Sequence, residues 1–506
     1  MILSASQATK RAFRRTKIIC TIGPASNTPD RIRELIREGM DVARINFSHA
    51  DYEGALETVR LLREARSEID VPLAIMLDTK GPEVRMFGYS GNVQLAAGET
   101  LYIESTDKQP GELQPEPPEK RHFYTNLPRI SSLCQAGARV LLQDGFIEAE
   151  VTQLHPGRAG AVTVRVLNAG TISEKTHLAV PGADYPIPFL SEKDRQDIRF
   201  AVKNGFEYIA LSFVRTAKDI ADVKALVKET DQASTVMLIA KIEDKKALAN
   251  IYDIIRDSDG IMVARGDLGI EVPIEELPGL QKNIVKRCYL AGKPVIVATQ
   301  MLESMTERPY PTRAEVTDTA NAVMDLTSAV MLSGETAKGA HPARVVNMMG
   351  RIIDRTESAT DYRTLARITH DYVDRDNITN IMAFSVVEMA HDWNAGAICV
   401  ITASGIGARS LSKYRPSVPI YAFTHNETLY HQLALNWGVI PCLIEAPEGH
   451  RFSEVARLAM ERLRKKGAIT AGDKLVFMGS SPFGKRRPTN TIRCETVGDE
   501  AFHDEI

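Results

Sequence analysis

The chain has 506 residues, of which 44% are hydrophobic and 25% are charged, and its formal net charge at pH 7 is −3. This length allows about three domains of ~100–200 residues each, and the charge argues against a protein that binds nucleic acid or a membrane surface. No apolar run approaches the ~20 residues of a membrane span, and the six cysteines are widely spread, which argues against a disulfide framework or a zinc site.

The N-terminal segment carries basic residues between Lys10 and Lys17, but no long apolar core or small-residue cleavage site follows them. The sequence therefore predicts no leader peptide. The spread of the cysteines is typical of a reducing compartment, so we expect a cytoplasmic protein.

Eight short apolar runs have the length and β-branched content of buried parallel strands. They cover residues 17–22, 41–45, 72–77, 208–213, 237–240, 260–264, 294–298 and 329–332. Segments of helical periodicity separate most of them, at 30–38, 53–69, 192–204, 218–229, 246–256, 274–291 and 313–325. Asp30 is placed to start the first helix and Gly39 to end it. The alternation predicts a parallel α/β sheet, and eight units are what a closed (β/α)₈ TIM barrel requires, with an open doubly wound sheet as the alternative.

Roughly 130 residues, rather than about 30, separate the third run from the fourth. They include short runs with alternating polarity, at 93–95, 101–103, 140–142, 149–151 and 162–166, and a loop rich in Pro and Glu at 107–120. This pattern predicts an all-β domain inserted at 81–181, between barrel segments 1–80 and 182–355. Because the insertion is rooted on the carboxyl rim of the barrel, we expect it to act as a lid.

The strand and helix pattern restarts in the last part of the chain, which we predict to be a C-terminal α/β domain at 356–506. The expected strands are 397–401, 420–423, 439–444 and 474–478, with 492–496 at an edge, and the expected helices are 379–392, 408–414, 429–435 and 453–466. The tail at 498–506 is polar and acidic, which is typical of a disordered segment.

Charged residues stand where two successive barrel strands should end. The run 237–240 leads to Lys241 and Glu243, and the run 260–264 leads to Arg265, Gly266 and Asp267. The carboxyl edge of parallel strands is where α/β proteins place their chemistry. A lysine and two carboxylates at this edge predict a metal-assisted site that acts on an anion, with a buried ion-pair network as the alternative.

Other strands bring polar groups to the same predicted rim, so that five of the eight contribute. Alternation puts Arg44, Asn46 and Ser48 on one face of the second strand, which suits a site that holds an anion and a hard cation together. The remaining groups are Asp78, Thr79 and Arg85 after the third strand and Thr299 after the seventh. Any one of them alone is more typical of a turn or a helix cap.

Together these segments resemble pyruvate kinase. The resemblance is carried by 17–26 (KIICTIGPAS), 41–49 (DVARINFSH), 76–85 (MLDTKGPEVR), 239–244 (IAKIED), 260–269 (GIMVARGDLG), 297–305 (VATQMLESM), 311–322 (PTRAEVTDTANA) and 331–338 (MLSGETAK). It implies phosphoryl transfer from phosphoenolpyruvate to ADP, giving pyruvate and ATP.

The resemblance also implies roles for catalytic residues. Lys241 would neutralise charge on the phosphoryl group and on the forming enolate, and Arg44 would clamp the phosphate. The backbone N–H groups of Gly266 and Asp267 would hold the substrate carboxylate. Thr299 would lie near the face where the enolate takes its proton, with Thr299 itself or a water chain as the acid.

Two cation sites and a nucleotide site are implied in the same way. Glu243 and Asp267 would hold Mg²⁺ or Mn²⁺. Asn46, Ser48, Asp78 and the Thr79 carbonyl would bind K⁺, and Glu83 stands where a glutamate accompanies a K⁺ requirement in the family. The residues expected near the nucleotide are Asn46, His49, Arg85 and Lys175.

The sequence departs from the family in two places. The segment Ser173–Leu178 lacks the glycine that usually follows the nucleotide-contacting lysine, which weakens the assignment of Lys175.

The segment formed by Thr402, Ser404, Gly405, Gly407 and Arg409 matches the family's effector site, where a sugar phosphate or AMP would bind, but it lacks the usual hydroxyl residue at Gly407. A plain strand–helix turn is the alternative there, and the basic residues Lys485, Arg486 and Arg487 could complete such a site. The family also implies a homotetramer.

Two other functional classes remain open from the residues. A Mg²⁺-dependent aldolase or lyase on the same barrel would share the lysine and carboxylates but would not need Arg85 or a lid. A non-catalytic metabolite sensor would be expected only if Lys241, Glu243 or Asp267 had been lost.

Overall fold

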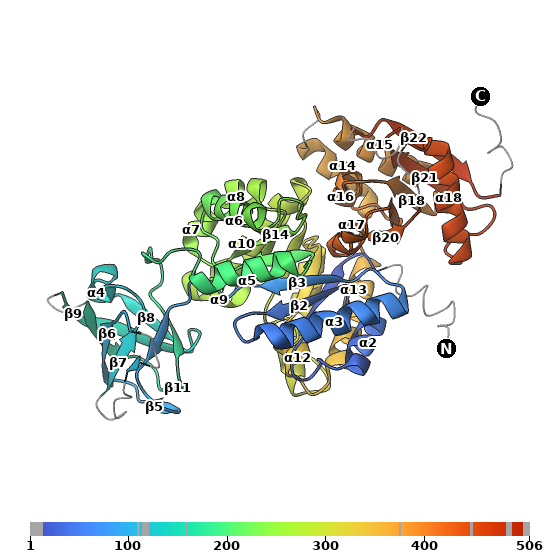
Figure 1. The fold of residues 1–506 in the computed structure, drawn as a ribbon. Coiled ribbons are helices and arrows are strands. Elements are labelled where there is room, and N and C mark those ends of the chain that lie inside the picture. The colour runs from blue at the N-terminus through green and yellow to red at the C-terminus, as the bar shows by residue number, and fades with distance from the viewer. Residues whose placement is uncertain are drawn as a thin grey trace.

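The computed structural model describes residues 14–108, 112–113, 121–156, 160–373, 376–445, 449–481 and 488–498. A large barrel occupies the middle of the molecule (Figure 1). A smaller β-barrel projects from one end of it, and an α/β domain lies at the other end.

The large barrel is closed, which confirms the predicted fold and excludes an open doubly wound sheet. Its strands are β1 (Lys17–Thr21), β2 (Val42–Asn46), β3 (Ala74–Asp78), β13 (Tyr208–Leu211), β14 (Met237–Ile242), β15 (Gly260–Ala264), β16 (Val295–Ala298) and β17 (Ala329–Leu332). Neighbouring strands are parallel, and β1 pairs with β17 to close the ring. All carboxyl ends therefore meet at one rim.

Alternating side chains of these strands fill two cores. Residues such as Ile19, Met76, Tyr208 and Met262 point inward and fill the barrel, while their neighbours in sequence pack against the surrounding helices. Because both faces are buried, the strands read as continuous apolar runs.

The helices around the barrel largely follow the predicted segments. The helices that cover the barrel are α2 (Pro29–Glu38), α3 (Tyr52–Ile69), α5 (Glu192–Lys203), α6 (Ala217–Thr230), α7 (Lys245–Ala249), α8 (Ile251–Asp257), α10 (Leu277–Leu290), α11 (Arg313–Met324) and α13 (Pro342–Glu357). Short helical turns lie between them, namely α9 (Arg265–Glu271), η3 (Ile274–Glu276), η4 (Glu303–Thr306) and α12 (Gly334–Ala337).

Two helix predictions need correction. The first helix is capped by Thr28, whose side chain accepts from the Arg31 N–H, and Asp30 lies inside the first turn. The segment 246–256 is two helices rather than one, because the Asn250 side-chain amide donates to the carbonyls of Lys246 and Arg215 and interrupts the helix.

The inserted domain is all-β, as predicted. Seven strands close its barrel: β4 (Arg85–Phe87), β6 (Thr100–Ser105), β7 (His122–Thr125), β8 (Arg139–Leu142), β9 (Ile147–His155), β10 (Ala161–Val166) and β12 (Thr176–Ala179). The strands β5 (Val93–Leu95) and β11 (Gly170–Ile172) form a separate pair, and α4 covers Ile130–Leu133. The strands β4, β7, β11 and β12 were not predicted because they are short and give little alternation.

The C-terminal domain is a five-stranded sheet in the order β20-β19-β18-β21-β22. Its strands are β18 (Ala397–Ile401), β19 (Ile420–Thr424), β20 (Val439–Leu443), β21 (Lys474–Gly479) and the antiparallel edge strand β22 (Thr491–Thr496). Its helices are α14 (Tyr362–Tyr372), α15 (Ile378–Asp392), α16 (Ile406–Lys413), α17 (Glu427–Gln432), η5 (Leu433–Leu435) and α18 (Phe452–Lys465). Helix α14 was not predicted.

The domain limits remain predictions, and α13 continues to Glu357, just past the expected limit at 355. The basic residues Lys485–Arg487 and the tail beyond Gly498 lie outside the described residues, as do Lys10 and most of the loop at 107–120. Within the described part of the chain, no helix is long and apolar enough to cross a membrane.

Candidate active site

Lys241 stands at the centre of the rim and is 9% exposed. Its ammonium group donates to Ser212 Oγ at 2.7 Å and to Asp78 Oδ1 at 3.2 Å, and it lies 2.9 Å from Glu243 Oε1. Asp78 ends β3, Ser212 follows β13, and Lys241 and Glu243 lie at the end of β14. Three adjacent strands therefore place these groups within one buried cluster.

Arg44 joins the same cluster from β2. Its Nε donates to Asp78 Oδ2 at 2.6 Å and its Nη1 to Thr21 Oγ1 at 2.9 Å. Burial acts to raise the pKa of Asp78, but Arg44 and Lys241 outweigh that effect and lower it. Asp78 is therefore an anion that holds two cationic side chains in place.

Glu243 and Asp267 form a pair of carboxylates, of which Glu243 is buried and Asp267 is half-buried. Glu243 Oε2 accepts from the Phe213 N–H at 2.6 Å, and Asp267 comes from the first turn of α9 and lies beside Glu243. Burial raises the pKa of both groups, and repulsion from Asp267 adds to the shift of Glu243. Among the described residues, no cluster of three or more His, Cys, Asp or Glu side chains could hold a metal ion. Two oxygen donors fit Mg²⁺, which usually keeps waters and takes further ligands from a substrate.

Thr299 follows β16 and lies against the start of α9. Its hydroxyl donates to the Ala298 carbonyl at 2.6 Å and accepts from the Gly266 N–H at 2.8 Å. The Gly266 N–H, which the resemblance assigns to the substrate carboxylate, is thus bonded to Thr299 in this structure.

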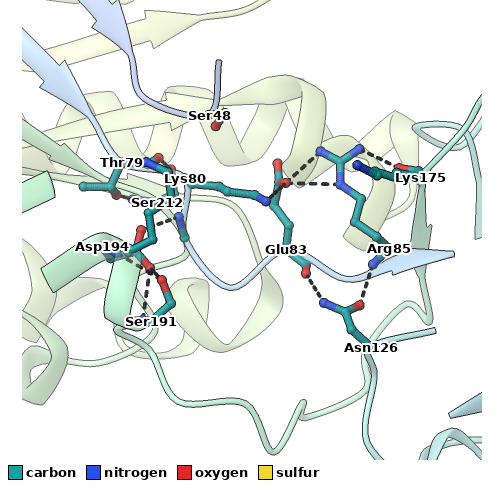
Figure 2. A network of polar contacts seen from close by, with 12 residues as sticks. Ser48, Thr79, Lys80, Glu83, Arg85, Asn126, Lys175, Ser191, Asp194 and Ser212 are labelled. Carbon is teal, nitrogen blue, oxygen red and sulfur yellow. Dashed lines mark hydrogen bonds and ion pairs between the residues drawn. The ribbon is translucent and has the colours of Figure 1, made fainter. Parts of the chain in front are cut away.

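The four residues expected to bind K⁺ lie at the ends of two adjacent strands. Asn46 and Asp78 are partners in the β2–β3 register, and Asn46 Oδ1 accepts from the Ser48 N–H at 3.1 Å. The Thr79 carbonyl accepts from the Ser212 hydroxyl at 2.7 Å, and the Ser212 N–H donates to Thr79 Oγ1 (Figure 2).

The nucleotide-side residues lie along the connection to the inserted domain. Figure 2 shows Glu83 between Lys80 and Arg85, with Arg85 reaching toward Lys175. Arg85 Nη2 lies 2.7 Å from Glu83 Oε2, and its Nη1 donates to the Lys175 carbonyl at 3.1 Å. His49 is exposed in the turn just past the end of β2.

Three residues of this region received no role from the sequence. Ser212 bridges Lys241 to the Thr79 carbonyl. Asp194, at the start of α5, accepts from the Gly81 N–H. Arg265 binds carbonyl groups around Thr299. The only available signal was position, because Ser212 and Arg265 each directly follow a strand.

The segment expected to bind an effector forms a tight turn between β18 and α16. Thr402 Oγ1 accepts from the Gly405 N–H at 2.9 Å, and Arg409 Nη2 donates to the Ser404 carbonyl at 2.8 Å. Gly407 packs against Val400. The five residues are brought together, with Arg409 folded back onto the loop.

Comparisons with known proteins point to one family. The family model described as "Pyruvate kinase, barrel domain" matches residues 13–346, and "Pyruvate kinase, alpha/beta domain" matches residues 380–494. A pyruvate kinase of Geobacillus stearothermophilus is 41% identical over 488 residues, covering 96% of this chain and 81% of the relative. One from Bacillus licheniformis is 39% identical with the same coverage. A crystal structure of a pyruvate kinase from Cryptosporidium parvum is 37% identical, with a TM-score of 0.88 over 97% of each chain.

Proposed function

The chain belongs to the pyruvate kinase family, and we propose that the rim around Lys241 is where its two substrates react. The reaction is transfer of the phosphoryl group of phosphoenolpyruvate to ADP, which gives pyruvate and ATP in glycolysis. An aldolase, a lyase or a metabolite sensor is therefore set aside. The observation that carries the site assignment is the convergence of Lys241, Arg44, Glu243 and Asp267 on one rim of the barrel.

Charge repulsion is the main obstacle to this reaction. Both substrates are polyanions, and one pair of unit charges at about 4 Å repels by about 4 kcal/mol at an effective dielectric of about 20. Several such pairs must be offset before the reacting atoms can meet. We assign Arg44 to the phosphate of phosphoenolpyruvate and Arg85 to the nucleotide side, since each is a fixed guanidinium that matches phosphate geometry.

Lys241 is the proposed stabiliser of the transition state. Burial acts to lower its pKa, but Asp78 and Glu243 outweigh that effect and raise it, so the ammonium group stays charged. It is held by Ser212 and Asp78 before any substrate arrives, and a preorganised charge of this kind acts on the phosphoryl group in transfer and then on the enolate.

Glu243 and Asp267 are the proposed ligands of the divalent ion. Burial raises the pKa of both carboxylates, and the charge of Asp267 adds to the shift of Glu243, so a cation bound beside them would be favourable, which supports this assignment. When bound there, Mg²⁺ or Mn²⁺ would neutralise substrate oxygens. The N–H groups of Gly266 and Asp267 at the start of α9 would hold the substrate carboxylate, which requires Thr299 to release the Gly266 N–H.

K⁺ is proposed at Asn46, Ser48, Asp78 and the Thr79 carbonyl. The set offers neutral oxygens and one carboxylate, and the Thr79 carbonyl is already oriented by Ser212. The nucleotide would lie across the rim toward the inserted domain, near Asn46, His49, Arg85 and Lys175. Thr299 would lie beside the enolate face that takes the proton.

Assembly, regulation and location are also proposals. Ile368, Tyr372, Ile378 and Ile381 are exposed on α14 and α15, which supports burial of this face in a homotetramer. The tight turn at Thr402–Arg409 supports a site for a sugar phosphate or AMP. The six cysteines are all free, which supports a cytoplasmic location.

A coupled assay tests the proposal. Purified protein is mixed with phosphoenolpyruvate, ADP, Mg²⁺ and K⁺, and pyruvate is followed with lactate dehydrogenase and NADH. We expect turnover that requires both substrates and falls on substitution of Arg44 or Lys241. Wild-type turnover that survives both substitutions would place the reaction elsewhere.

A further inference from the structure

Arg265 is the first residue of α9 and stands directly before Gly266 and Asp267. It is 8% exposed, so its charge needs a partner inside the protein. Nη1 lies 2.7 Å from both carboxylate oxygens of Asp318, a residue of α11. This pairing fixes the plane of the guanidinium.

The rest of the guanidinium binds the backbone that leaves β16. Nη2 donates to the Thr299 carbonyl at 2.6 Å and to the Gln300 carbonyl at 3.3 Å, and Nε donates to the Ala298 carbonyl at 3.3 Å. One side chain therefore holds three consecutive carbonyl groups.

The backbone held in this way is strained. Thr299 has φ +68° and Gln300 has φ +52°, so two successive residues with side chains are in the left-handed region. That conformation is unfavourable for a β-branched residue such as threonine and persists only where surrounding contacts impose it. The hydrogen bonds that Arg265 donates to the carbonyl groups of this turn are contacts of that kind.

The strained turn determines where the Thr299 hydroxyl lies. It is 2.8 Å from the Gly266 N–H, and a Cβ at Gly266 would lie 3.5 Å from Thr299 Oγ1. If the backbone at 299 and 300 relaxed to negative φ, the hydroxyl would leave the first turn of α9 and thus the neighbourhood of Asp267.

We propose that Arg265, fixed by Asp318, is a positioning residue that imposes the left-handed conformation of Thr299 and Gln300 and thereby holds the Thr299 side chain at the first turn of α9, beside the substrate face where the enolate is protonated. The inference rests on the proposed function, which places Thr299 at that face. Arg265 acts through Thr299, and the proton goes to C3 of the enolate to form the methyl group of pyruvate.

The test separates protonation from phosphoryl transfer. Pyruvate is incubated with the enzyme, ATP, Mg²⁺ and K⁺ in D₂O, and exchange of its methyl protons is followed by NMR, while phosphoryl transfer is measured in the coupled assay. We expect Arg265→Lys and Asp318→Asn to lower exchange by about 10²-fold, since a misplaced group of this kind costs about that factor. We expect phosphoryl transfer and the KM for phosphoenolpyruvate to change much less.

A rescue variant distinguishes positioning from general support of the fold. Gln300 is exposed, and glycine adopts a left-handed φ without strain. Adding Gln300→Gly to Arg265→Gln should therefore restore exchange by about tenfold, which corresponds to relief of one strained residue. Lys282→Gln is the matched control, because it breaks an ion pair with Asp325 that joins α10 to the end of α11 without contacting Arg265.

The outcomes are distinct. Equal loss of exchange and phosphoryl transfer in Asp318→Asn and Arg265→Lys, or unchanged exchange in both, overturns the inference. Failure of Gln300→Gly to restore exchange overturns it as well. If Arg265→Gln does not fold, the two conservative variants decide. A wild-type protein without pyruvate kinase turnover would overturn the proposed function instead.

Discussion

Asp78 accepts hydrogen bonds from two cationic side chains at once and shows how the site is preorganised at the level of single residues. Its oxygens hold Arg44 and Lys241, so both cations are in position before a substrate binds. A site that is rigid before binding loses less free energy in reorganisation when charge develops. We therefore expect the arrangement to favour the transition state rather than the ground state.

Substitution of Lys241 tests this directly. We expect Lys241→Met to lower kcat by at least ~10²-fold, as for loss of a donor that stabilises developing charge, while the binding of phosphoenolpyruvate stays largely intact. Steady-state kinetics and equilibrium binding of phosphoenolpyruvate measure the two effects. Lys228→Met, on the exposed face of α6, is the matched control. Near-normal turnover of the Lys241 variant would remove this residue from its role.

The expected dependence of activity on K⁺ can be tested at Glu83. Its carboxylate lies between Lys80 and Arg85 and adds no positive charge to the site, so we expect K⁺ to supply that charge. We expect activity to fall by about 10²-fold in a buffer free of Na⁺ and K⁺. Glu83→Lys should recover part of that loss, whereas Glu174→Lys in the inserted domain should not. Full activity of the wild-type protein without these ions would contradict the prediction.

At the scale of elements, the connection between β3 and β4 joins the site to the inserted domain. Gly81 lies within it, and its N–H donates to Asp194 Oδ1 at 3.0 Å. Asp194 also accepts from the Ser191 hydroxyl and N–H at the start of α5 (Figure 2). One buried carboxylate thus ties the connection to a barrel helix, next to the Thr79 carbonyl.

Gly81→Ala should disturb this connection. Gly81 has φ +73°, and a Cβ would lie 2.7 Å from the Ser212 Cβ, so the change adds overpacking to backbone strain. We expect a loss of stability of roughly 2–4 kcal/mol and a lower kcat, because Ser212 also holds Lys241. Gly91→Ala is the control, since Gly91 has φ +68° but open space around it. Thermal denaturation and turnover are measured for both variants. Equal losses in the two would show that the close contact with Ser212 does not contribute to the effect of Gly81→Ala.

The same elements show what sequence could predict. Barrel strands such as β14 and β15 were predicted because both faces are buried, which leaves a continuous apolar run. Strands of the inserted domain such as β4 are as short as three residues, and their pairing partners are far away in the sequence.

The residues of the candidate site also divide into those that a local sequence pattern predicts and those that depend on distant contacts. Arg44, Lys241, Glu243 and Asp267 could be predicted from their positions after buried strands. The bond between Gly81 and Asp194 joins residues 113 positions apart, and the left-handed turn at Thr299 depends on contacts from Arg265. Neither leaves a local pattern in the sequence.

At the scale of the whole molecule, the C-terminal domain closes the end of the barrel opposite the proposed active site. Leu435 belongs to the apolar cluster inside the barrel, and the Tyr208 hydroxyl donates to the Gln432 carbonyl at 2.6 Å. Gln432 in turn donates to the Thr235 carbonyl. The C-terminal domain therefore contacts strand β13 directly, and Ser212 in the proposed active site follows the end of that strand.

His431 makes this contact sensitive to pH. It is 5% exposed, its Nδ1 accepts from the Leu73 N–H, and burial together with the charges of Arg66 and Arg63 lowers its pKa to about 3. The unfolded chain binds a proton near pH 6.5 and the folded chain does not, so stability is full above that pH and falls as the pH drops toward 3.

We expect about 2 kcal/mol of this stabilisation to be lost between pH 7 and pH 5. His431→Gln keeps an acceptor for the Leu73 N–H but cannot be protonated in this pH range. The loss of stability between pH 7 and pH 5 should therefore be smaller in the variant than in the wild-type protein by about 2 kcal/mol, whatever the stability of the variant at pH 7. Denaturation midpoints at several pH values, compared with those of His450→Gln in a loop of the same domain, measure the difference. If stability falls with pH in parallel for the wild-type protein and His431→Gln, His431 is not the source of the pH dependence. A flatter profile of stability for His431→Gln alone would place that dependence at this end of the barrel.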